Sequence, residues 1–158
     1  MNWTVGPDPS VVRSRKTPDW SRSLELVTTL TNPVSGTQYE SAADSRYVLT
    51  FTYDPLHWIE FYYRYQNNSN CFLVKQDSDT GDLYINKVIA GSPTILFYEP
   101  AFFKEDPYEI IVEAHGQNHT FVINGALVFA RTDPMLPTEA GLRIYDDYVT
   151  DVVLKVYS

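Results

Sequence analysis

The last third of the chain, residues 108–158, constrains the fold most strongly, because its strand-length apolar runs are joined by turn residues and show no helical period. Asn124-Gly125 lies between two such runs, and this dipeptide is the strongest short-range signal of a β-hairpin. A type I′ turn needs positive φ at both central residues, which Asn and Gly tolerate. Gly116-Gln117-Asn118 indicates a second, looser turn. The segment therefore predicts an antiparallel sheet.

The same pattern of short β-branched or aromatic runs separated by turn residues begins upstream, at residue 24. We expect strands over residues 24–30, 47–53, 58–65, 71–75, 82–88 and 94–98. One short helical turn is expected within residues 99–107. Ten or so short strands predict an all-β sandwich or barrel.

The chain of 158 residues is long enough for one domain with a sizeable core. Residues 1–23 combine prolines with basic residues and show little periodicity, which predicts an extended N-terminal arm that docks onto another protein subunit. We expect a single domain over residues 24–158.

The composition argues against some classes of binding partner. A net charge of −8 and a pI near 4.7 argue against nucleic acid and anionic lipid, which reward basic patches. No apolar run approaches the roughly 18 residues of a membrane span. The first residues show no secretory signal, so we expect a cytoplasmic chain, a piece of a longer protein, or one released by lysis or assembly. The single cysteine, Cys71, lies in an apolar run and is expected to be buried.

Several segments occur in a characteristic order: residues 61–74 (beginning Phe-Tyr-Tyr-Arg-Tyr), 81–96, 112–128, 140–145 and 149–156. In order and spacing they resemble laminin-G-like, concanavalin A-like lectin domains over about residues 44–158. The resemblance implies a jelly-roll β-sandwich of two antiparallel sheets, whose usual role is glycan binding or adhesion.

A second resemblance covers residues 15–21, 32–42 and 47–54. These segments are similar to the opening of some tailed-phage tail proteins, although Gln38-Tyr39 interrupts the pattern before Glu40. The similarity implies a virion component, located on a virion or an extracellular surface.

Catalysis by paired carboxylates is not expected. Sugar-cleaving enzymes of the lectin-like fold carry a Glu-x-Asp-x-x-Glu motif, and this sequence has none. Glu109 and Glu113 share a strand face but stand about 13 Å apart, so we expect solvated outer positions with Ile110 and Val112 turned inward. His115 and His119, on either side of a turn, are expected to be surface histidines rather than a zinc pair.

Calcium is the one cofactor that the sequence suggests. Residues 77–82 fail the EF-hand pattern, because glycine falls at the fifth position instead of the sixth. Asp151 matches the acidic residue at the start of the last strand of laminin-G-like domains. The resemblance therefore implies a structural calcium at Asp151, which Asp146 and Asp147 could help to hold.

Strand alternation predicts an amphipathic face that turns away from the apolar partners on each strand. The candidate ligand-binding residues on this face are Tyr62, Arg64, Tyr84, Asn86, Arg143 and Tyr145. Such a face suits a glycan, but tyrosine is also enriched at subunit interfaces, and the pattern does not choose between them.

The function predicted from the sequence is non-catalytic recognition or assembly at a particle or cell surface, with a glycan as ligand, in a phage virion. The alternative is a carbohydrate-binding module of a polysaccharide-degrading enzyme.

Overall fold

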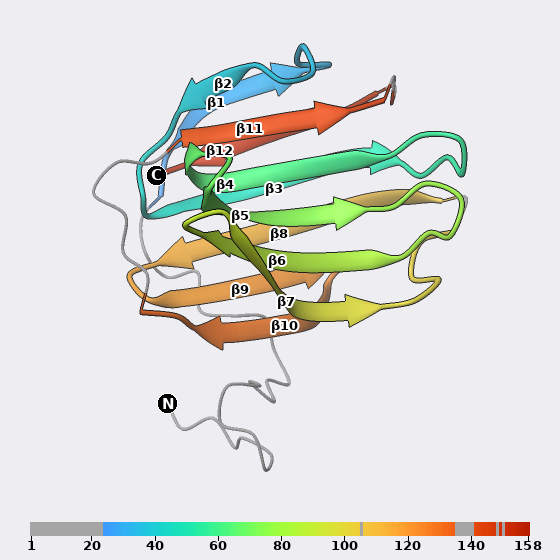
Figure 1. The fold of residues 1–158 in the computed structure, drawn as a ribbon. Helices are drawn as coiled ribbons and strands as arrows, with labels where there is room; N and C mark the ends of the chain where they lie inside the picture. Colours follow the sequence, from blue (N-terminus) through green and yellow to red (C-terminus); the bar gives the residue numbers. More distant parts are fainter. Residues whose placement is uncertain (1–23, 105, 135–140, 148, 150) are drawn as a thin grey trace.

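The computed structural model describes residues 24–104, 106–134, 141–147, 149 and 151–158. This part of the chain forms twelve β-strands in two six-stranded sheets that pack face to face (Figure 1). All neighbouring strands are antiparallel. The all-β sandwich is confirmed, while the predicted arm at residues 1–23 lies outside the described residues.

Each sheet mixes strands from distant parts of the chain. Sheet A contains, in spatial order, β1 (Leu26–Thr31), β12 (Val153–Tyr157), β3 (Ser45–Thr52), β8 (Pro107–His115), β9 (Asn118–Ile123) and β10 (Ala126–Thr132). Sheet B, in front in Figure 1, contains β2 (Gln38–Glu40), β11 (Gly141–Asp146), β4 (Ile59–Asn67), β5 (Asn70–Gln76), β6 (Leu83–Ile89) and β7 (Ser92–Glu99).

The predicted turns join consecutive strands of sheet A. Asn124 (φ +49°) and Gly125 (φ +79°) connect β9 to β10, with the positive φ values that a type I′ turn requires. Gly116 (φ +56°) opens the turn between β8 and β9. The Asn124 side chain also accepts a hydrogen bond from the Glu109 N–H at 2.7 Å, so the hairpin is tied to β8.

The six strands expected upstream all form, as β1 and β3–β7, whereas the three-residue β2 was not predicted. The helical turn expected within residues 99–107 is wrong. Ala101 has a φ of +52°, which no right-handed helix allows, and its N–H donates to the Asp82 carboxylate at 2.8 Å. The Phe103 N–H donates to the Gly81 carbonyl at 2.8 Å, so the segment is held against the β5–β6 loop instead.

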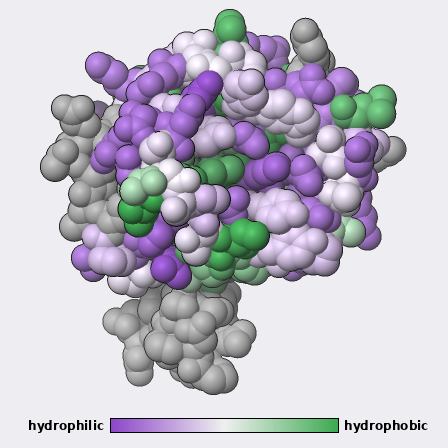
Figure 2. Space-filling view, in the orientation of Figure 1, coloured by the Kyte–Doolittle hydropathy of each residue, from purple (hydrophilic) through white to green (hydrophobic). Residues whose placement is uncertain are grey.

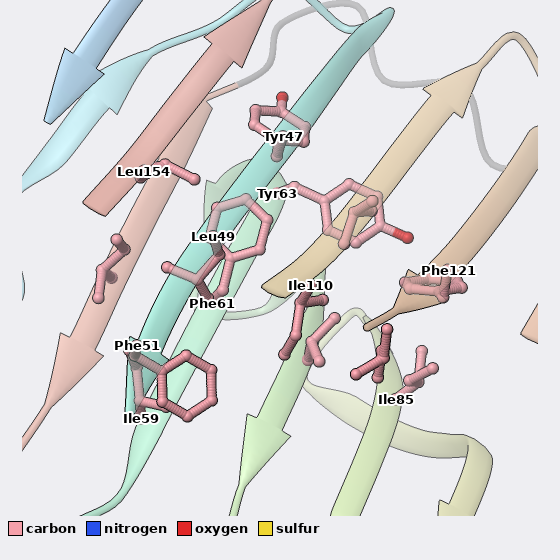
Figure 3. Close-up of a cluster of buried hydrophobic side chains, with 14 of the residues drawn as sticks. Tyr47, Leu49, Phe51, Ile59, Phe61, Tyr63, Ile85, Ile110, Phe121 and Leu154 are labelled. Atoms are coloured by element: carbon pink, nitrogen blue, oxygen red, sulfur yellow. The ribbon is translucent and has the colours of Figure 1, made fainter. Parts of the chain in front are cut away.

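Alternate residues of both sheets fill the core between them (Figure 3). Aromatic rings dominate: Tyr47 packs edge-on against Phe61 at 5.1 Å, and Tyr63 stacks on Phe72 at 5.4 Å. Burial of each such side chain stabilises the fold by about 1.5–3 kcal/mol. Ile110 and Val112 point inward as predicted, and Cys71 is buried.

His119 corrects one sequence prediction. It was expected on the surface, but only 2% of it is exposed, and its Nδ1 lies 2.7 Å from the Tyr63 hydroxyl. In β9 it has the same parity as Phe121 and Ile123, which both face the core. Burial lowers the pKa of His119 to about 4, so the ring is neutral near pH 7. His115 is exposed, as predicted.

The position of Glu113 corrects a second prediction made from the sequence. We expected a solvated carboxylate, but Glu113 is buried and accepts a hydrogen bond from Arg46 Nε at 3.0 Å. Arg46 on β3 stands directly opposite Glu113 on β8, so the two side chains form an ion pair across the strands. Glu109 is exposed, as expected.

Candidate functional site

The face of sheet B that points away from the core carries two rows of side chains, each running across five strands. The aromatic row joins directly opposed residues of β11, β4, β5, β6 and β7: Tyr145, Glu60, Lys75, Tyr84 and Tyr98. The central row lies beside it: Arg143, Tyr62, Leu73, Asn86 and Ile95. Because opposed residues of antiparallel strands project to the same side, all ten share the outer face.

Five of the six predicted site residues belong to these rows: Tyr62, Tyr84, Asn86, Arg143 and Tyr145. The structure therefore brings them onto one surface, and their role in binding stays a prediction. Sequence reasoning missed Lys75 and Tyr98 as members. Both lie on strands that were predicted, but the register that aligns them with Tyr84 and Glu60 cannot be read from local sequence.

A shallow pocket of about 290 Å³ lies over the central row, on the part of it that belongs to β11, β4 and β5. We call it the central pocket; its lining residues are Glu60, Tyr62, Asn68, Leu73, Val88, Arg143 and Tyr145. Leu73 and Val88 are its most buried members and pack with Tyr65 and Cys71 in a small apolar cluster. Figure 2 shows a hydrophobic area near the middle of this face, bordered by hydrophilic residues. The volume is close to the lower limit for small-molecule sites.

Arg143 is held rigidly at the edge of the central pocket. Its Nε donates to the Gly36 carbonyl at 3.1 Å, and its Nη1 donates to the Tyr65 hydroxyl (3.1 Å) and to Asn68 Oδ1 (2.8 Å). The guanidinium carbon lies 5.7 Å from the Tyr65 ring centre and 5.1 Å from that of Tyr145. Among the described residues, these three hydrogen bonds and two ring contacts fix the position of the guanidinium beside the pocket.

Glu60 supplies a carboxylate to the same pocket. The Tyr62 hydroxyl donates to Glu60 Oε1 at 2.6 Å, and Lys75 Nζ lies 4.0 Å from Oε2. Burial, followed by this hydrogen bond, raises the pKa of Tyr62 well above its usual value, so the phenol stays neutral. Glu60 keeps acceptor positions for hydroxyl groups, since an ionised carboxylate has about four lone-pair sites.

Two pairs of stacked rings mark the aromatic row. Trp58 stacks on Tyr145 with centres 5.1 Å apart, and Tyr84 stacks on Tyr98 with centres 4.8 Å apart. Tyr145 is 42% exposed and Tyr98 is 46% exposed. Such rings offer both an apolar surface and a polar hydroxyl to a ligand.

Arg64 is the predicted site residue that the structure places elsewhere. We expected it beside Tyr62 on the exposed face, but its side chain is fully buried. Its Nε donates to the Ala43 carbonyl at 3.1 Å, and its Nη2 donates to the Asp44 carboxylate at 3.2 Å. The expected exposure of Arg64 is therefore wrong, and the guanidinium ties β4 to the segment before β3.

The cause is an irregularity in β4. Its register against β5 shifts between Tyr63 and Asn67, and Arg64 adopts a left-handed φ of +45°. An irregularity of this kind interrupts the alternation of side chains along a strand. Arg64 consequently turns away from the outer face, and Tyr65, which strict alternation sends into the core, joins the apolar cluster under the central pocket.

Asp151, the residue proposed for calcium, is exposed and has a φ of +58° just before β12. Across the residues that the structure describes, no three His, Cys, Asp or Glu side chains come together as a metal site. Asp146 uses Oδ2 to accept a hydrogen bond from the Val149 N–H. A structural calcium at Asp151 stays a prediction.

No protein-family model and no curated protein sequence matches this chain. Solved structures do resemble it. The carbohydrate-binding module CBM66 from Bacillus subtilis is 15% identical, with a TM-score of 0.54 over 84% of this chain and 91% of the module. The Caenorhabditis elegans galectin LEC-6 is 12% identical, with a TM-score of 0.59 over 82% of this chain and 93% of the galectin.

A third similar structure is the CBM2 module of the evolved Dit protein of Lactobacillus casei BL23 phage J-1. It is 15% identical, with a TM-score of 0.52 over 73% of this chain and 60% of that chain. At such identities the likeness concerns the fold. It confirms the predicted jelly-roll β-sandwich of two antiparallel sheets.

The structure also bears on the membrane. In the part of the chain that it describes, no helix has the length and apolar character needed to cross a bilayer.

Proposed function

We propose that this protein is a non-catalytic recognition protein that binds a glycan at the central pocket of sheet B. The observation that carries the proposal is the composition of that pocket. It combines an apolar floor at Leu73 and Val88, a fixed guanidinium at Arg143, a carboxylate at Glu60 and an exposed ring at Tyr145. A sugar has the matching chemistry, because its C–H faces pack on rings while its hydroxyls both donate and accept hydrogen bonds.

Binding suits this pocket better than hydrolysis does. Glycosidases generally place two carboxyl groups on either side of the scissile bond, about 5–9.5 Å apart. Glu60 is the one carboxylate among the residues that line the central pocket. Its Oε1 is engaged by the Tyr62 hydroxyl at 2.6 Å, which suits a fixed acceptor.

We propose that this glycan-binding protein is located on the surface of a phage virion. Two observations support it: the similarity of residues 15–21, 32–42 and 47–54 to phage tail proteins, and the fold shared with the module of a phage Dit protein. In that setting residues 1–23 would dock onto a neighbouring subunit. Deletion of residues 1–18 tests this role: particle incorporation should be lost, and incorporation equal to the full-length chain would contradict it.

The alternative is a carbohydrate-binding module of a polysaccharide-degrading enzyme. The fold shared with CBM66 favours it, since that structure is itself a carbohydrate-binding module. Neighbouring genes separate the two settings: genes for tail or head proteins support the virion, and a glycosidase reading frame joined to this sequence supports the enzyme module.

An oligosaccharide array tests the binding itself. Ladders of one to six units from β-1,4-glucan, β-1,4-galactan and oligomannuronate would be presented to the full chain. We expect retention on at least one ladder and at least tenfold weaker binding for Tyr145→Ala and Glu60→Gln. Glu109→Gln, which changes an exposed carboxylate on sheet A, is the matched control and should bind like wild type. No retention on any ladder, or equal binding by all three variants, would overturn the proposal.

A further inference from the structure

The central pocket occupies only one end of the outer face of sheet B. Tyr145 and Glu60 line it, but Lys75, Tyr84 and Tyr98 of the same aromatic row lie beyond it. Neighbouring strands stand about 4.8 Å apart, so the row from Tyr145 to Tyr98 covers four spacings, or about 19 Å. That length exceeds what a single sugar in the pocket would use.

The far end of the row is organised like a second subsite. Tyr84 and Tyr98 stack at 4.8 Å, and Lys75 Nζ lies 5.6 Å from the centre of the Tyr84 ring. The Tyr98 hydroxyl donates to Asp82 Oδ2 at 3.0 Å, which fixes the orientation of an exposed ring. The edge strand β7 presents Tyr98 together with Ile95, which is 60% exposed.

Charge along the row indicates the class of ligand. In the middle of the row, Lys75 Nζ lies 4.0 Å from Glu60 Oε2 and 3.6 Å from Asp77 Oδ1. The two carboxylates therefore compensate the positive charge of Lys75. Arg143 spends three of its five N–H donors on Gly36, Tyr65 and Asn68. The whole chain carries −8. A polyanionic glycan would therefore find little net positive charge here and a repulsive background.

We propose that the aromatic row is an extended binding track for a neutral oligosaccharide of about four units, which lies across the strands from Tyr145 to Tyr98. The number of units follows because one sugar ring is about as long as one strand spacing, about 5 Å. Tyr84 and Tyr98 form the second subsite. This inference rests on the proposed function, since it extends the same ligand beyond the central pocket.

Titration calorimetry with the three ladders tests the track. We expect affinity for a neutral ladder to rise at least tenfold between two and four units and then to level off. Tyr98→Ala should remove that gain and leave the affinity for the two-unit ligand unchanged, and Tyr84→Ala should repeat this selective loss. Tyr145→Ala should weaken every length. Val27→Ala removes an exposed apolar side chain from β1 of sheet A and should change nothing.

The outcomes separate the two proposals. Full affinity at two units, with no effect of Tyr98→Ala, would overturn the track and leave the glycan site at the central pocket standing. Binding of the oligomannuronate ladder alone would overturn the neutral ligand. A change in oligomeric state on Tyr98→Ala, measured by light scattering with affinity unchanged, would make the β7 edge a subunit interface instead. Failure of every ladder to bind would overturn both proposals.

Discussion

Replacement of Arg64 by alanine should make this protein much less stable and leave its affinity for the ligand unchanged. Arg64 is fully buried, and its guanidinium bonds to the Ala43 carbonyl and the Asp44 carboxylate. Alanine at this position can keep the same left-handed backbone, so the change acts through the lost side chain. The free energy of unfolding should fall by several kcal/mol.

The magnitude follows from the contacts. Loss of two buried methylenes costs about 1.6 kcal/mol. The half-buried Ala43 carbonyl, left without its Arg64 donor, costs about 1–2 kcal/mol, the lower part of the range for a buried group. Asp44 contributes little, because its side chain is 45% exposed and it keeps hydrogen bonds to the Gly116 N–H and His115. The sum is about 3–4 kcal/mol.

Urea unfolding followed by circular dichroism measures this loss, and calorimetry with the bound ladder measures affinity in the same samples. Arg143→Ala is the matched comparison, because Arg143 is partly exposed at the central pocket. We expect Arg143→Ala to weaken binding and to destabilise the protein less than Arg64→Ala does, because Arg143 and its hydrogen bonds are partly exposed. A stability loss below about 1 kcal/mol for Arg64→Ala, together with lost binding, would refute the structural role and return Arg64 to the ligand site.

Three further predictions concern the turn, pH and calcium. Gly125→Val should destabilise the protein by about 1 kcal/mol or more in urea unfolding, because Gly125 has a φ of +79° that a β-branched residue resists; an unchanged midpoint would contradict the type I′ turn. Burial lowers the pKa of His119 from 6.5 to about 4, so the unfolded chain binds the proton first and stability should fall as pH drops from 6.5 to 4, by up to about 3 kcal/mol. Urea midpoints at pH 7 and 4.5 should therefore differ less in His119→Gln than in wild type, and equal differences would refute a neutral buried ring. If Asp151 holds calcium, the ion should raise the melting temperature of wild type but not of Asp151→Ala, and a temperature that calcium and chelator leave unchanged would remove the site.

The candidate site was predictable only in part, and Tyr62 shows where local pattern suffices. Strict alternation holds from Ile59 to Tyr63, so the outward direction of Glu60 and Tyr62 follows from parity alone. One residue later the prediction fails, because the register shift in β4 depends on how it meets β5. The buried guanidinium of Arg64 also pairs with Asp44, a residue twenty positions away in sequence.

Arg143 shows the same division. Its strand and its outward parity were predicted, since Leu142 and Ile144 are clearly apolar. Its partners Gly36 and Asn68 come from two loops that are distant in sequence, and no local pattern relates them. Its orientation at the central pocket was therefore unpredictable.

Features that depend on neighbours along the chain were predictable from local pattern: the strand-length runs, the positive-φ turn at Asn124-Gly125 and the inward parity of Ile110 and Val112. Tertiary packing set which strands became neighbours and in what register. It thereby placed Tyr145, from the end of the chain, in one row with Tyr84 and Tyr98. The reason is that strand pairing is set by burial of a shared core, to which residues far apart in sequence contribute together.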